Sequence, residues 1–586
     1  MIKKPNTKLK QKNTKLKSDI TVTINNNKIV CESGKTIMAV ARGNGIFIPG
    51  LCGHPDFPPK ANCRVCVVEI EGRKNLQTAC SVKAENGMKI LTDSERVKKV
   101  RNLNIELIFA EHIEKCPTCI WRTNCTLLAM ADRYKIEIKR FPDRKLNRKT
   151  YKFANAVEID GSQCIDCRNC IDACSIMQKI NYLELKGKGV HQEIVPTKDK
   201  DKACIMCGQC ALHCPVGSAQ EQADWDKVEN LLKNKKGKIL IAQFAPSVRV
   251  TIGEEFGLNY DKKSTGKMVT ALKQLGFDHV FDVNFFADVT TMVEAKELLD
   301  RAAEGGTMPM MTSCCPGWVN YLEFYHPELI PNLTTSKSPH IHGGGIIKTH
   351  WAEKNNIDPK NIIIVSVMPC TAKKFEASRK ELMVNGSNPI DLVITTRELA
   401  WMIRKNKIDY ASLKSVETDN PFGNFSGAAA IYGASGGVME SALRTAQVLA
   451  CGKQTLCKTR LDFTQVRGMD GIKEATVEVG NIKVRVAVVN GIGNIDKVLD
   501  NLDRYDYIEV MACLGGCLGG GGQPQPTTPD IRKKRMEAIY SLDKSKKIRK
   551  AHENKEVLEI LKWLEEKGHD LEHEVLHTKY YNRRKK

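Results

Sequence analysis

The stretch EVMACLGGCLGGGGQP, residues 509–524, places Cys513 and Cys517 at the end of an apolar run that predicts a buried strand over residues 507–511. Six of the ten residues 513–522 are glycine, and each weakens an ordinary helix or strand by about 1 kcal/mol. A flexible linker is one interpretation, but linkers combine Gly with Ser and do not carry Met-Ala-Cys and a closing Pro. The glycines therefore predict a backbone that approaches a bulky group other than a side chain, such as a buried inorganic cluster.

Two further cysteine stretches have the same context. TSCCPGW (residues 312–318) follows the run MPMM, and MPCTAKKFE (residues 368–376) follows the strand-like run IIIVSV. All three stretches lie just past the C-terminal ends of predicted buried strands. In open parallel α/β sheets, ligands bind at that edge.

Together the three stretches resemble, in wording and in order, the motifs of the [FeFe]-hydrogenases, which catalyse the reversible reaction 2H+ + 2e− = H2. The resemblance implies that Cys315, Cys370, Cys513 and Cys517 bind the [4Fe-4S] part of a catalytic H-cluster. It also implies that Cys517 bridges to a two-iron unit that carries CO, cyanide and a dithiolate.

Length and composition fit a multidomain metalloprotein. A chain of 586 residues exceeds what one hydrophobic core supports. Many of its 23 cysteines fall in C-x2-C clusters, behind a lysine-rich N-terminus with no apolar signal segment. This pattern indicates metal sites in a reducing compartment and predicts a cytoplasmic protein. No apolar run approaches the roughly 18 residues that span a bilayer, so no membrane association is expected.

The formal net charge of +22 could indicate a nucleic-acid surface. However, this count treats the cysteines as neutral, and each thiolate-ligated cluster would bring on the order of one or two negative charges. We therefore expect no nucleic-acid partner. The excess basic charge is interpreted as cluster compensation and as a docking surface for an acidic electron carrier.

The N-terminal part divides into two predicted segments. Residues 1–18 carry seven lysines and no acid, and they are expected to be a disordered basic tail. In residues 19–96, two short strands flank an Asn-rich turn over residues 25–27, and a helix is predicted over residues 36–42. The segment resembles a plant-type [2Fe-2S] ferredoxin with a β-grasp fold, and its expected ligands are Cys52, Cys63, Cys66 and Cys80.

Residues 97–150 are predicted to be helical, with one histidine and three cysteines in the pattern His112-x3-Cys116-x2-Cys119-x5-Cys125. On spacing alone, tetrahedral zinc and iron are equally compatible with this set. The resemblance to the larger hydrogenases favours a His-ligated [4Fe-4S] cluster.

Residues 151–228 contain a duplicated C-x2-C-x2-C-x3-C run, the pattern of two-cluster bacterial ferredoxins. In that pattern the fourth cysteine of each run binds the other cluster. One [4Fe-4S] cluster is thus expected on Cys164, Cys167, Cys170 and Cys214, and the other on Cys204, Cys207, Cys210 and Cys174.

Residues 229–586 alternate predicted strands with helices, which is typical of parallel sheets covered on both faces. The resemblance implies two lobes around the H-cluster, and the last 45 residues are expected to be helical and basic. His340–Gly345, with two histidines and three glycines, is expected to be a surface loop, and Cys451 and Cys457 match no motif. The fold class expected for the whole chain is multidomain α+β and α/β.

Cys314 is a free thiol beside a committed ligand, so it is either an inert buried cysteine or a proton relay. The resemblance extends a proton path to Glu294, Thr334, Glu297 and Arg301, with Thr334 where the family usually has Ser. Without it, Glu294 and Glu297 would be an ordinary solvated helix face. The resemblance also implies that Lys373 hydrogen-bonds cyanide, and that Ser247 and Pro246 do likewise through side chain or backbone. It implies that Met368 and Met511 shape an apolar cage around the cluster.

The expected cofactors are the H-cluster, one [2Fe-2S] and three accessory [4Fe-4S] clusters. Ferredoxin, another acidic carrier, or a partner subunit that binds NAD(P) or flavin would exchange electrons with them, since no Rossmann or flavin motif is present in the chain. Hydrogenase maturation proteins are further expected partners. A related iron–sulfur assembly or nuclear scaffold protein would lack parts of the three motifs, and a sensory hydrogenase would differ at the relay cysteine.

Overall fold

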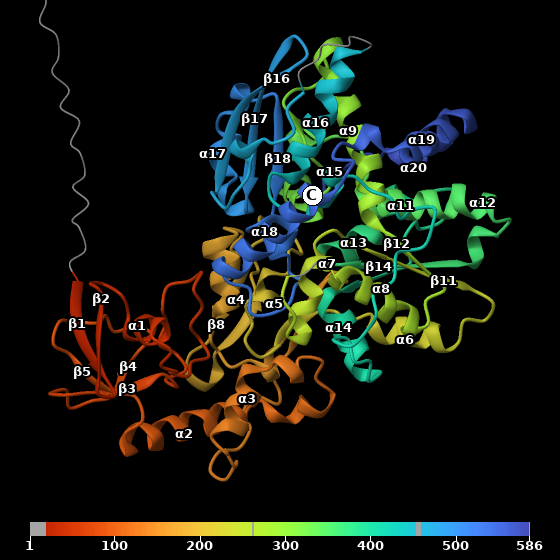
Figure 1. Cartoon of the computed structure of the whole chain (residues 1–586). Helices are drawn as coiled ribbons and strands as arrows, with labels where there is room; N and C mark the ends of the chain where they lie inside the picture. The colour runs from red at the N-terminus through yellow and green to blue at the C-terminus, as the bar shows by residue number, and fades with distance from the viewer. Residues whose placement is uncertain (1–18, 261–262, 453–458, 585–586) are drawn as a thin grey trace, which may run out of the picture.

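The computed structural model of this chain describes residues 19–260, 263–452 and 459–584 (Figure 1). The tail expected over residues 1–18 and Cys457 lie outside these ranges. In Figure 1 the chain runs from an N-terminal body at the lower left, through a middle region, to a larger C-terminal part.

Residues 19–96 form a mixed five-stranded sheet in the order β2-β1-β5-β3-β4. The predicted hairpin is present, and Asn25 and Asn26 close it with φ of 47° and 69°, a conformation that Asn tolerates better than most residues. The helix begins at Thr36, whose side chain accepts a hydrogen bond from the Ala39 amide. The elements are β1 (Asp19–Ile24), β2 (Asn27–Glu32), α1 (Ile37–Gly43), β3 (Val67–Ile70), β4 (Gln77–Thr78) and β5 (Lys89–Leu91).

The next segment is helical, as predicted, and its metal-binding pattern lies between two helices. These helices are α2 (Glu95–Ala110) and α3 (Thr126–Arg133). Ser94 caps α2 by accepting a hydrogen bond from the Val97 amide.

The two halves of the duplicated cysteine run have the same backbone path. In the first half Asp166 and Arg168 have positive φ of 54° and 65°, and in the second half Met206 and Gly208 have 60° and 70°. Each pair leads into a one-turn helix, which supports an internal repeat. The elements here are β6 (Thr150–Phe153), β7 (Val157–Asp160), α4 (Asn169–Asp172), β8 (Leu183–Lys186), β9 (Glu193–Pro196), α5 (Gln209–Leu212), β10 (Ala219–Glu221) and α6 (Trp225–Lys233).

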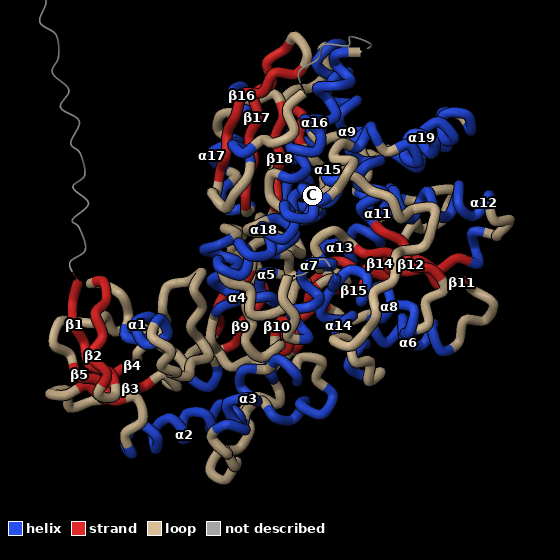
Figure 2. The backbone as a smooth tube through the Cα atoms, viewed as in Figure 1, coloured by secondary structure: helices blue, strands red, loops and turns tan. Residues whose placement is uncertain are grey.

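The C-terminal part contains two four-stranded sheets, visible as separate groups of strands in Figure 2. The first has the order β12-β11-β14-β15 and is entirely parallel. The second has the order β13-β18-β17-β16, parallel except for the hairpin of β16 and β17. The strands are β11 (Ile239–Phe244), β12 (His279–Asp282), β13 (Met310–Met311), β14 (Ile362–Met368), β15 (Leu392–Thr395), β16 (Ile472–Val479), β17 (Ile482–Asn490) and β18 (Tyr507–Met511).

The helices around these sheets centre on α9, which begins at the capping residue Asp282 and ends at Gly305 with φ of 76°. α9 packs against α11 and α16. The helices are α7 (Val248–Thr251), α8 (Lys263–Leu275), α9 (Val283–Glu304), α10 (Pro316–Tyr325), α11 (Pro339–Ile346), α12 (Ala352–Lys354), α13 (Ala372–Ala377), α14 (Thr396–Lys405), α15 (Gly427–Ala430), α16 (Gly437–Cys451), α17 (Asp496–Leu499), α18 (Pro529–Ser545), α19 (Lys555–Lys567) and α20 (His569–Leu576).

The expected surface loop at His340–Gly345 is wrong, because these residues form the buried helix α11. A Cβ on Gly343 would lie 2.3 Å from the Gln243 side chain, and one on Gly344 would lie 2.3 Å from the Pro389 carbonyl oxygen. The glycines are therefore required by close packing against two neighbouring segments rather than by a turn.

Contacts between the N-terminal body and the rest of the chain include a buried ion pair. Asp56 receives two hydrogen bonds from Arg532 at the start of α18, at 2.7 and 2.9 Å. The His213 ring lies 3.4 Å from the same carboxylate and 4.5 Å, centroid to centroid, from His54. These groups connect three segments that are far apart in the sequence.

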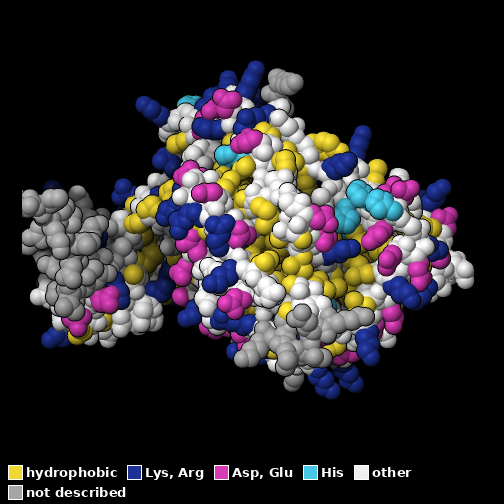
Figure 3. Space-filling model, turned by 90° about the horizontal axis from the view of Figure 1, so that it is seen from above, with side chains coloured by type: hydrophobic (Ala, Val, Ile, Leu, Met, Phe, Trp, Pro, Cys, Tyr) yellow, Lys and Arg dark blue, Asp and Glu magenta, His cyan; other side chains and the backbone are white. Residues whose placement is uncertain are grey.

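Basic and acidic side chains are intermixed on the face shown in Figure 3. Across the described ranges, no helix has both the length and the apolar composition needed to cross a bilayer.

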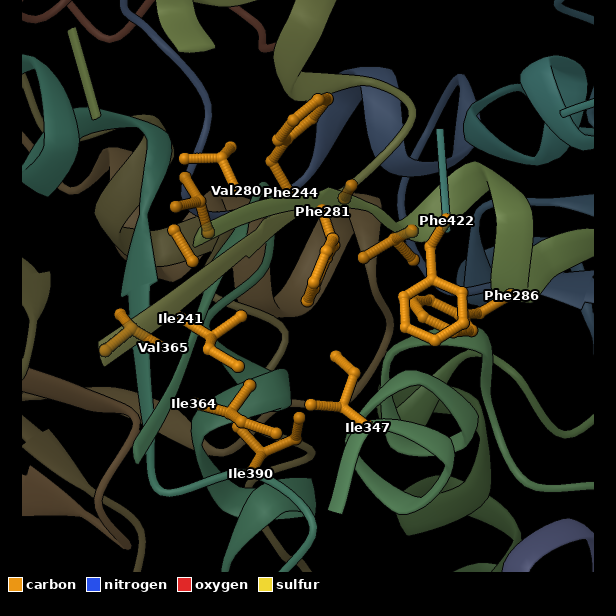
Figure 4. Close-up of a cluster of buried hydrophobic side chains, with 14 of the residues drawn as sticks. Ile241, Phe244, Val280, Phe281, Phe286, Ile347, Ile364, Val365, Ile390 and Phe422 are labelled. Atoms are coloured by element: carbon orange, nitrogen blue, oxygen red, sulfur yellow. The ribbon is translucent and has the colours of Figure 1, made fainter. Parts of the chain in front are cut away.

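The largest hydrophobic cluster lies on the first sheet of the C-terminal part (Figure 4). Ile241 of β11, Phe281 of β12 and Ile364 of β14 are fully buried, as expected for parallel strands covered on both faces. This packing fixes the sheet, so that the loops after its strands have defined positions.

Candidate active site and cluster ligands

The carboxyl ends of β11, β14 and β18 and the segment after β13 meet at one cavity of about 80 Å³. The sequence places cysteines at three of these four points, and the topology brings them together. Five cysteines line the cavity: Cys314, Cys315, Cys370, Cys513 and Cys517. Pro246, Ser247, Met368, Lys373 and Met511 line it as well.

The donor set fits an inorganic iron–sulfur group. Burial raises the pKa of the Cys315, Cys370 and Cys513 thiols, so these ligands need nearby positive charge to ionise. Lys373 is the single cationic side chain among the described residues that line the cavity. Four soft sulfur donors around an enclosed, mostly apolar space are typical of iron–sulfur binding.

Lys373 is held in place by three acceptors. Its ammonium donates to Ser338 Oγ at 2.9 Å and to the Cys314 carbonyl oxygen at 3.1 Å, and it lies 2.7 Å from Glu376. The His340 ring in turn contacts Glu376 at 2.6 Å. The Lys373 pKa is raised despite burial, chiefly by the charge of Glu376, so the residue carries a fixed positive charge into the cavity.

The glycine-rich stretch brings backbone close to backbone. A Cβ on Gly516 would lie 2.7 Å from the Ser435 amide nitrogen, and one on Gly520 would lie 2.3 Å from the Pro369 carbonyl oxygen. Gly521 approaches the Cys207–Gly208 backbone, where a Cβ would lie 2.4 Å from the Cys207 carbonyl oxygen. The bulky neighbours that the glycines predict thus include other protein segments as well as the cavity.

The structure also places the five candidate proton-path residues near one another. Cys314 lines the cavity, and burial, followed by the charge of Glu294, raises its pKa well above the ordinary value. Glu294 is 1 % exposed, and no hydrogen bond of normal geometry reaches its carboxyl oxygens among the described residues, although the Tyr507 hydroxyl is near enough to favour the charged form. Burial, followed by the charge of Glu297, raises the pKa of Glu294 to about 8.

Glu297 lies farther out on α9 and is strongly hydrogen-bonded. The Thr334 hydroxyl donates to Glu297 Oε2 at 2.5 Å, and Arg301 contacts Oε1 at 2.6 Å. The extra methyl of Thr334, compared with Ser, leaves this hydroxyl contact in place.

The cysteines of the duplicated run line two separate small cavities. Each cavity has three cysteines from one half and the fourth from the other half. The first is lined by Cys164, Cys167, Cys170 and Cys214, and the second by Cys174, Cys204, Cys207 and Cys210. Burial, followed by the charge of Cys207, raises the pKa of Cys513, so the second small cavity adjoins the main one.

The four cysteines of the N-terminal body are buried. They lie as two close pairs, Cys52 beside Cys63 and Cys66 beside Cys80. The neighbouring Cys63 thiol lowers the pKa of Cys52, and the neighbouring Cys66 thiol lowers that of Cys80.

His112 is buried and its Nδ1 lies 2.8 Å from the Gln163 carbonyl oxygen. Burial lowers its pKa, so the ring is neutral and its Nε2 is available to a metal.

Zinc would hold its ligand atoms within roughly 4 Å of one another. Throughout the described residues, the one group of three such side chains with ligand atoms within 4.8 Å is His54, Asp56 and His213, where Arg532 already pairs with the carboxylate.

Two residues beside Glu297, at the outer end of the candidate proton path, were not predicted from the sequence. Thr335 donates its hydroxyl to Glu297 Oε2 at 3.1 Å, and His577 contacts the same hydroxyl at 2.8 Å. His577 is remote from Glu297 in the chain, and neither residue belongs to a metal-binding motif.

Several family models match the chain. Residues 238–521 match the iron only hydrogenase large subunit, C-terminal domain, and residues 529–583 match the iron hydrogenase small subunit. A 2Fe-2S iron-sulfur cluster binding domain covers residues 17–95, and a 4Fe-4S dicluster domain covers residues 163–218. Residues 101–140 match the NADH-ubiquinone oxidoreductase-G iron-sulfur binding region.

Full-length relatives support the same family. The NADP-reducing hydrogenase subunit HndD of Solidesulfovibrio fructosivorans is 39 % identical over 97 % of this chain and 100 % of that protein. Iron hydrogenase 1 of Clostridium pasteurianum is 41 % identical over 96 % of this chain and 99 % of that protein. The solved apo [FeFe]-hydrogenase HydA1 of Chlamydomonas reinhardtii covers 61 % of this chain and 99 % of its own, with 38 % identity and a TM-score of 0.54. The chain therefore belongs to the [FeFe]-hydrogenases, and it is an iron hydrogenase that interconverts protons, electrons and H2.

Proposed function

We propose that Cys315, Cys370, Cys513 and Cys517 hold the H-cluster in the main cavity. The observation that carries this assignment is the convergence of four cysteines, from three separate strand ends, on one mostly apolar cavity. When bound, the H-cluster supplies the iron at which H2 is formed or split and, in its dithiolate, the neighbouring base. The chain contributes Lys373 as a hydrogen-bond donor to cyanide, and Pro246, Ser247, Met368 and Met511 as walls that exclude water.

The proposed proton path begins at the Cys314 thiol, which borders the cavity. The buried carboxyl of Glu294 is the next acceptor, and its pKa of about 8 allows it both to bind and to release a proton near neutral pH. Beyond it, the Thr334 hydroxyl donates to Glu297. Arg301 remains charged and orients Glu297 without carrying the proton itself.

The proposed electron path uses the accessory clusters. The cluster on Cys174, Cys204, Cys207 and Cys210 would lie next to the H-cluster, because its cavity adjoins the main one. The cluster on Cys164, Cys167, Cys170 and Cys214 would follow. Two outer clusters complete the set, a [2Fe-2S] cluster on Cys52, Cys63, Cys66 and Cys80 and a [4Fe-4S] cluster on His112, Cys116, Cys119 and Cys125. The corresponding domains span residues 19–96, 97–150, 151–228 and 229–586.

For the electron partner we propose ferredoxin or another acidic carrier, or a subunit that binds NAD(P) or flavin. The net charge of +22 favours an acidic carrier, and the similarity to an NADP-reducing hydrogenase subunit favours a partner subunit. The many cysteine ligands suit the reducing cytoplasm. Purification from the native source, followed by a gel that reveals co-purifying subunits, separates the two alternatives.

Complete assembly should give about 20 irons per chain: two in the first cluster, sixteen in four cubanes and two in the catalytic pair. Expression without hydrogenase maturation proteins should leave only the catalytic pair absent. Iron analysis and infrared spectroscopy of both preparations measure this directly. CO and cyanide bands in the protein made without maturases would contradict the assignment.

Replacing His112 by Ala should remove or convert one iron cluster, because Nε2 would no longer be available as a ligand. Turnover of H2 with a small artificial reductant should remain largely intact, since the H-cluster lies elsewhere. Iron content and electron paramagnetic resonance of the reduced protein would show the change, and the exposed His191→Ala serves as the control. Stoichiometric zinc in the wild-type protein at this site would refute the assignment.

A further inference from the structure

Helix α20 and the residue that follows it present a column of three histidines. His569, His573 and His577 recur every four residues, which places them along one side of a helix. Their rings stack with centroid distances of 5.9 and 5.5 Å and interplanar angles of 28° and 30°. His569 and His573 are exposed, whereas His577 is partly buried, and Figure 3 shows a contiguous group of histidine side chains on the face seen from above.

The inner end of this histidine column contacts the outer end of the proton path. His577 Nδ1 lies 2.8 Å from Thr335 Oγ1, and Thr335 donates to Glu297 Oε2 at 3.1 Å. The backbone fixes this arrangement, because Ser336 and His577 form a β-bridge and the Thr578 amide donates to the Thr335 carbonyl at 2.8 Å. Hydrogen bonds therefore run from Glu297 through Thr335 to the partly buried His577, whose ring stacks on the exposed His573.

We propose that the histidine column exchanges protons between solvent and Glu297, so that α20 forms the outer end of the proton path. This inference rests on the proton path proposed above. The segment that matches the iron hydrogenase small subunit, residues 529–583, would then take part in proton exchange as well as in packing.

The transfer balances without any change in oxidation state. With His577 protonated, the Nδ1–H proton passes to Thr335 Oγ1 while the Thr335 hydroxyl proton passes to Glu297 Oε2. One N–H bond breaks and one carboxyl O–H bond forms. His573 and surface water then restore the proton on His577, and the sequence runs in reverse during H2 oxidation.

Arg301 is the other polar group that links Glu297 to the surface, and it cannot transfer protons between Glu297 and solvent. Its guanidinium stays protonated at any ordinary pH, so it neither accepts nor passes on a proton. It is also fixed by the carbonyl oxygens of Thr307, Pro331 and Leu333. An imidazole, by contrast, changes protonation near neutral pH.

The charges around His577 favour release of a proton. Burial lowers its pKa, and Lys296 on α9, Lys337 in the segment before α11, and His573 on α20 act in the same direction. Glu297 opposes them. A proton that reaches His577 is therefore held weakly and passes readily to the carboxylate.

Glu297 itself is 13 % exposed and borders a surface groove, so water can also reach it directly. The column should therefore matter most when buffer is scarce. At low buffer concentration, the double variant His569→Gln/His573→Gln and the single variant His577→Gln should each lower D2/H2O isotope exchange by about fivefold, less than the loss of an essential relay. High concentrations of imidazole buffer should restore the rate.

The matched control is His191→Gln, which removes an exposed histidine outside this region and should leave the buffer dependence unchanged. A readout that needs no turnover is histidine C2 deuterium exchange followed by mass spectrometry. Glu297→Gln should lower the pH at the midpoint of the exchange-rate curve of His577 and leave the corresponding pH for His191 unaltered.

The inference would be overturned if the histidine-column variants kept the wild-type rate of D2/H2O exchange at low buffer concentration. It would also be overturned if Glu297→Gln left the midpoint pH of His577 deuterium exchange unchanged. Neither result would affect the proposed path from Cys314 to Glu297, which fails instead if Cys314→Ala with an intact H-cluster turns over normally.

Discussion

Cys314→Ala is expected to lower H2 production and H2 oxidation by at least about 100-fold, the scale of a removed proton-transfer group. The thiol borders the cavity, and the buried Glu294 is close enough to influence its pKa. Alanine leaves the cavity lined but ends proton exchange at this point. Cys314→Asp should recover part of the activity, because a carboxylate also carries a proton.

Assembly must be separated from proton transfer in this experiment. The alanine variant should keep its full iron content and its CO and cyanide infrared bands, as should the control Cys31→Ala in β2, which lies outside every motif. Wild-type turnover by the alanine variant with these bands present would make Cys314 a packing residue.

Glu294→Gln is expected to lower activity by about 100-fold while stabilising the protein. Gln preserves the shape of the side chain but cannot bind and release a proton. Because the pKa of Glu294 is raised to about 8, the folded chain keeps this carboxyl protonated at pH values where the unfolded chain has lost the proton. The wild type therefore loses stability as pH rises from about 4.5 to 8, on the order of 5 kcal/mol in total.

The measurement is the difference in anaerobic melting temperature between Glu294→Gln and wild type, which should grow with pH up to about 8 and then level off. Asp288→Asn is the control on the same helix, because Asp288 is buried but hydrogen-bonded to Ser426 and Asn554. It should keep H2 turnover. A Glu294→Gln variant with wild-type activity, or with a difference independent of pH, would remove the carboxyl from the path.

The sequence predicts the elements that depend on local pattern. The mostly apolar strands at Ile362–Met368 and Tyr507–Met511 and the hairpin before Thr36 are short-range features, and the structure has them. Strand β16, at a sheet edge, was not predicted, because the adjacent charges Lys473 and Glu474 interrupt the alternation of apolar and polar residues that indicates a strand. The residues of helix α11 were interpreted as a surface loop because of their glycines. These glycines are required by close packing against Gln243 and Pro389, which no local sequence pattern reveals.

The same distinction holds for the site. Metal-binding motifs concentrate their cysteines in short stretches, so candidate ligands can be named before the fold is known. The contact of His577 with Thr335 depends on where the C-terminal helix returns to the body of the protein. Such pairings are set by tertiary packing and remain invisible until the chain is folded.

The contacts made by the duplicated cysteine segment limit how this enzyme could be shortened by engineering. Arg397 donates to buried Glu221 at 2.6 Å and to the Gly521 carbonyl oxygen at 2.7 Å, and deleting the segment would leave its charge unpaired in the interior. The N-terminal body, residues 19–96, could be trimmed more easily, provided that Arg532, which would lose its partner Asp56, is also replaced by a neutral residue. A minimal variant for electrode attachment would therefore begin after the N-terminal body and keep residues 151–228 as part of the catalytic unit.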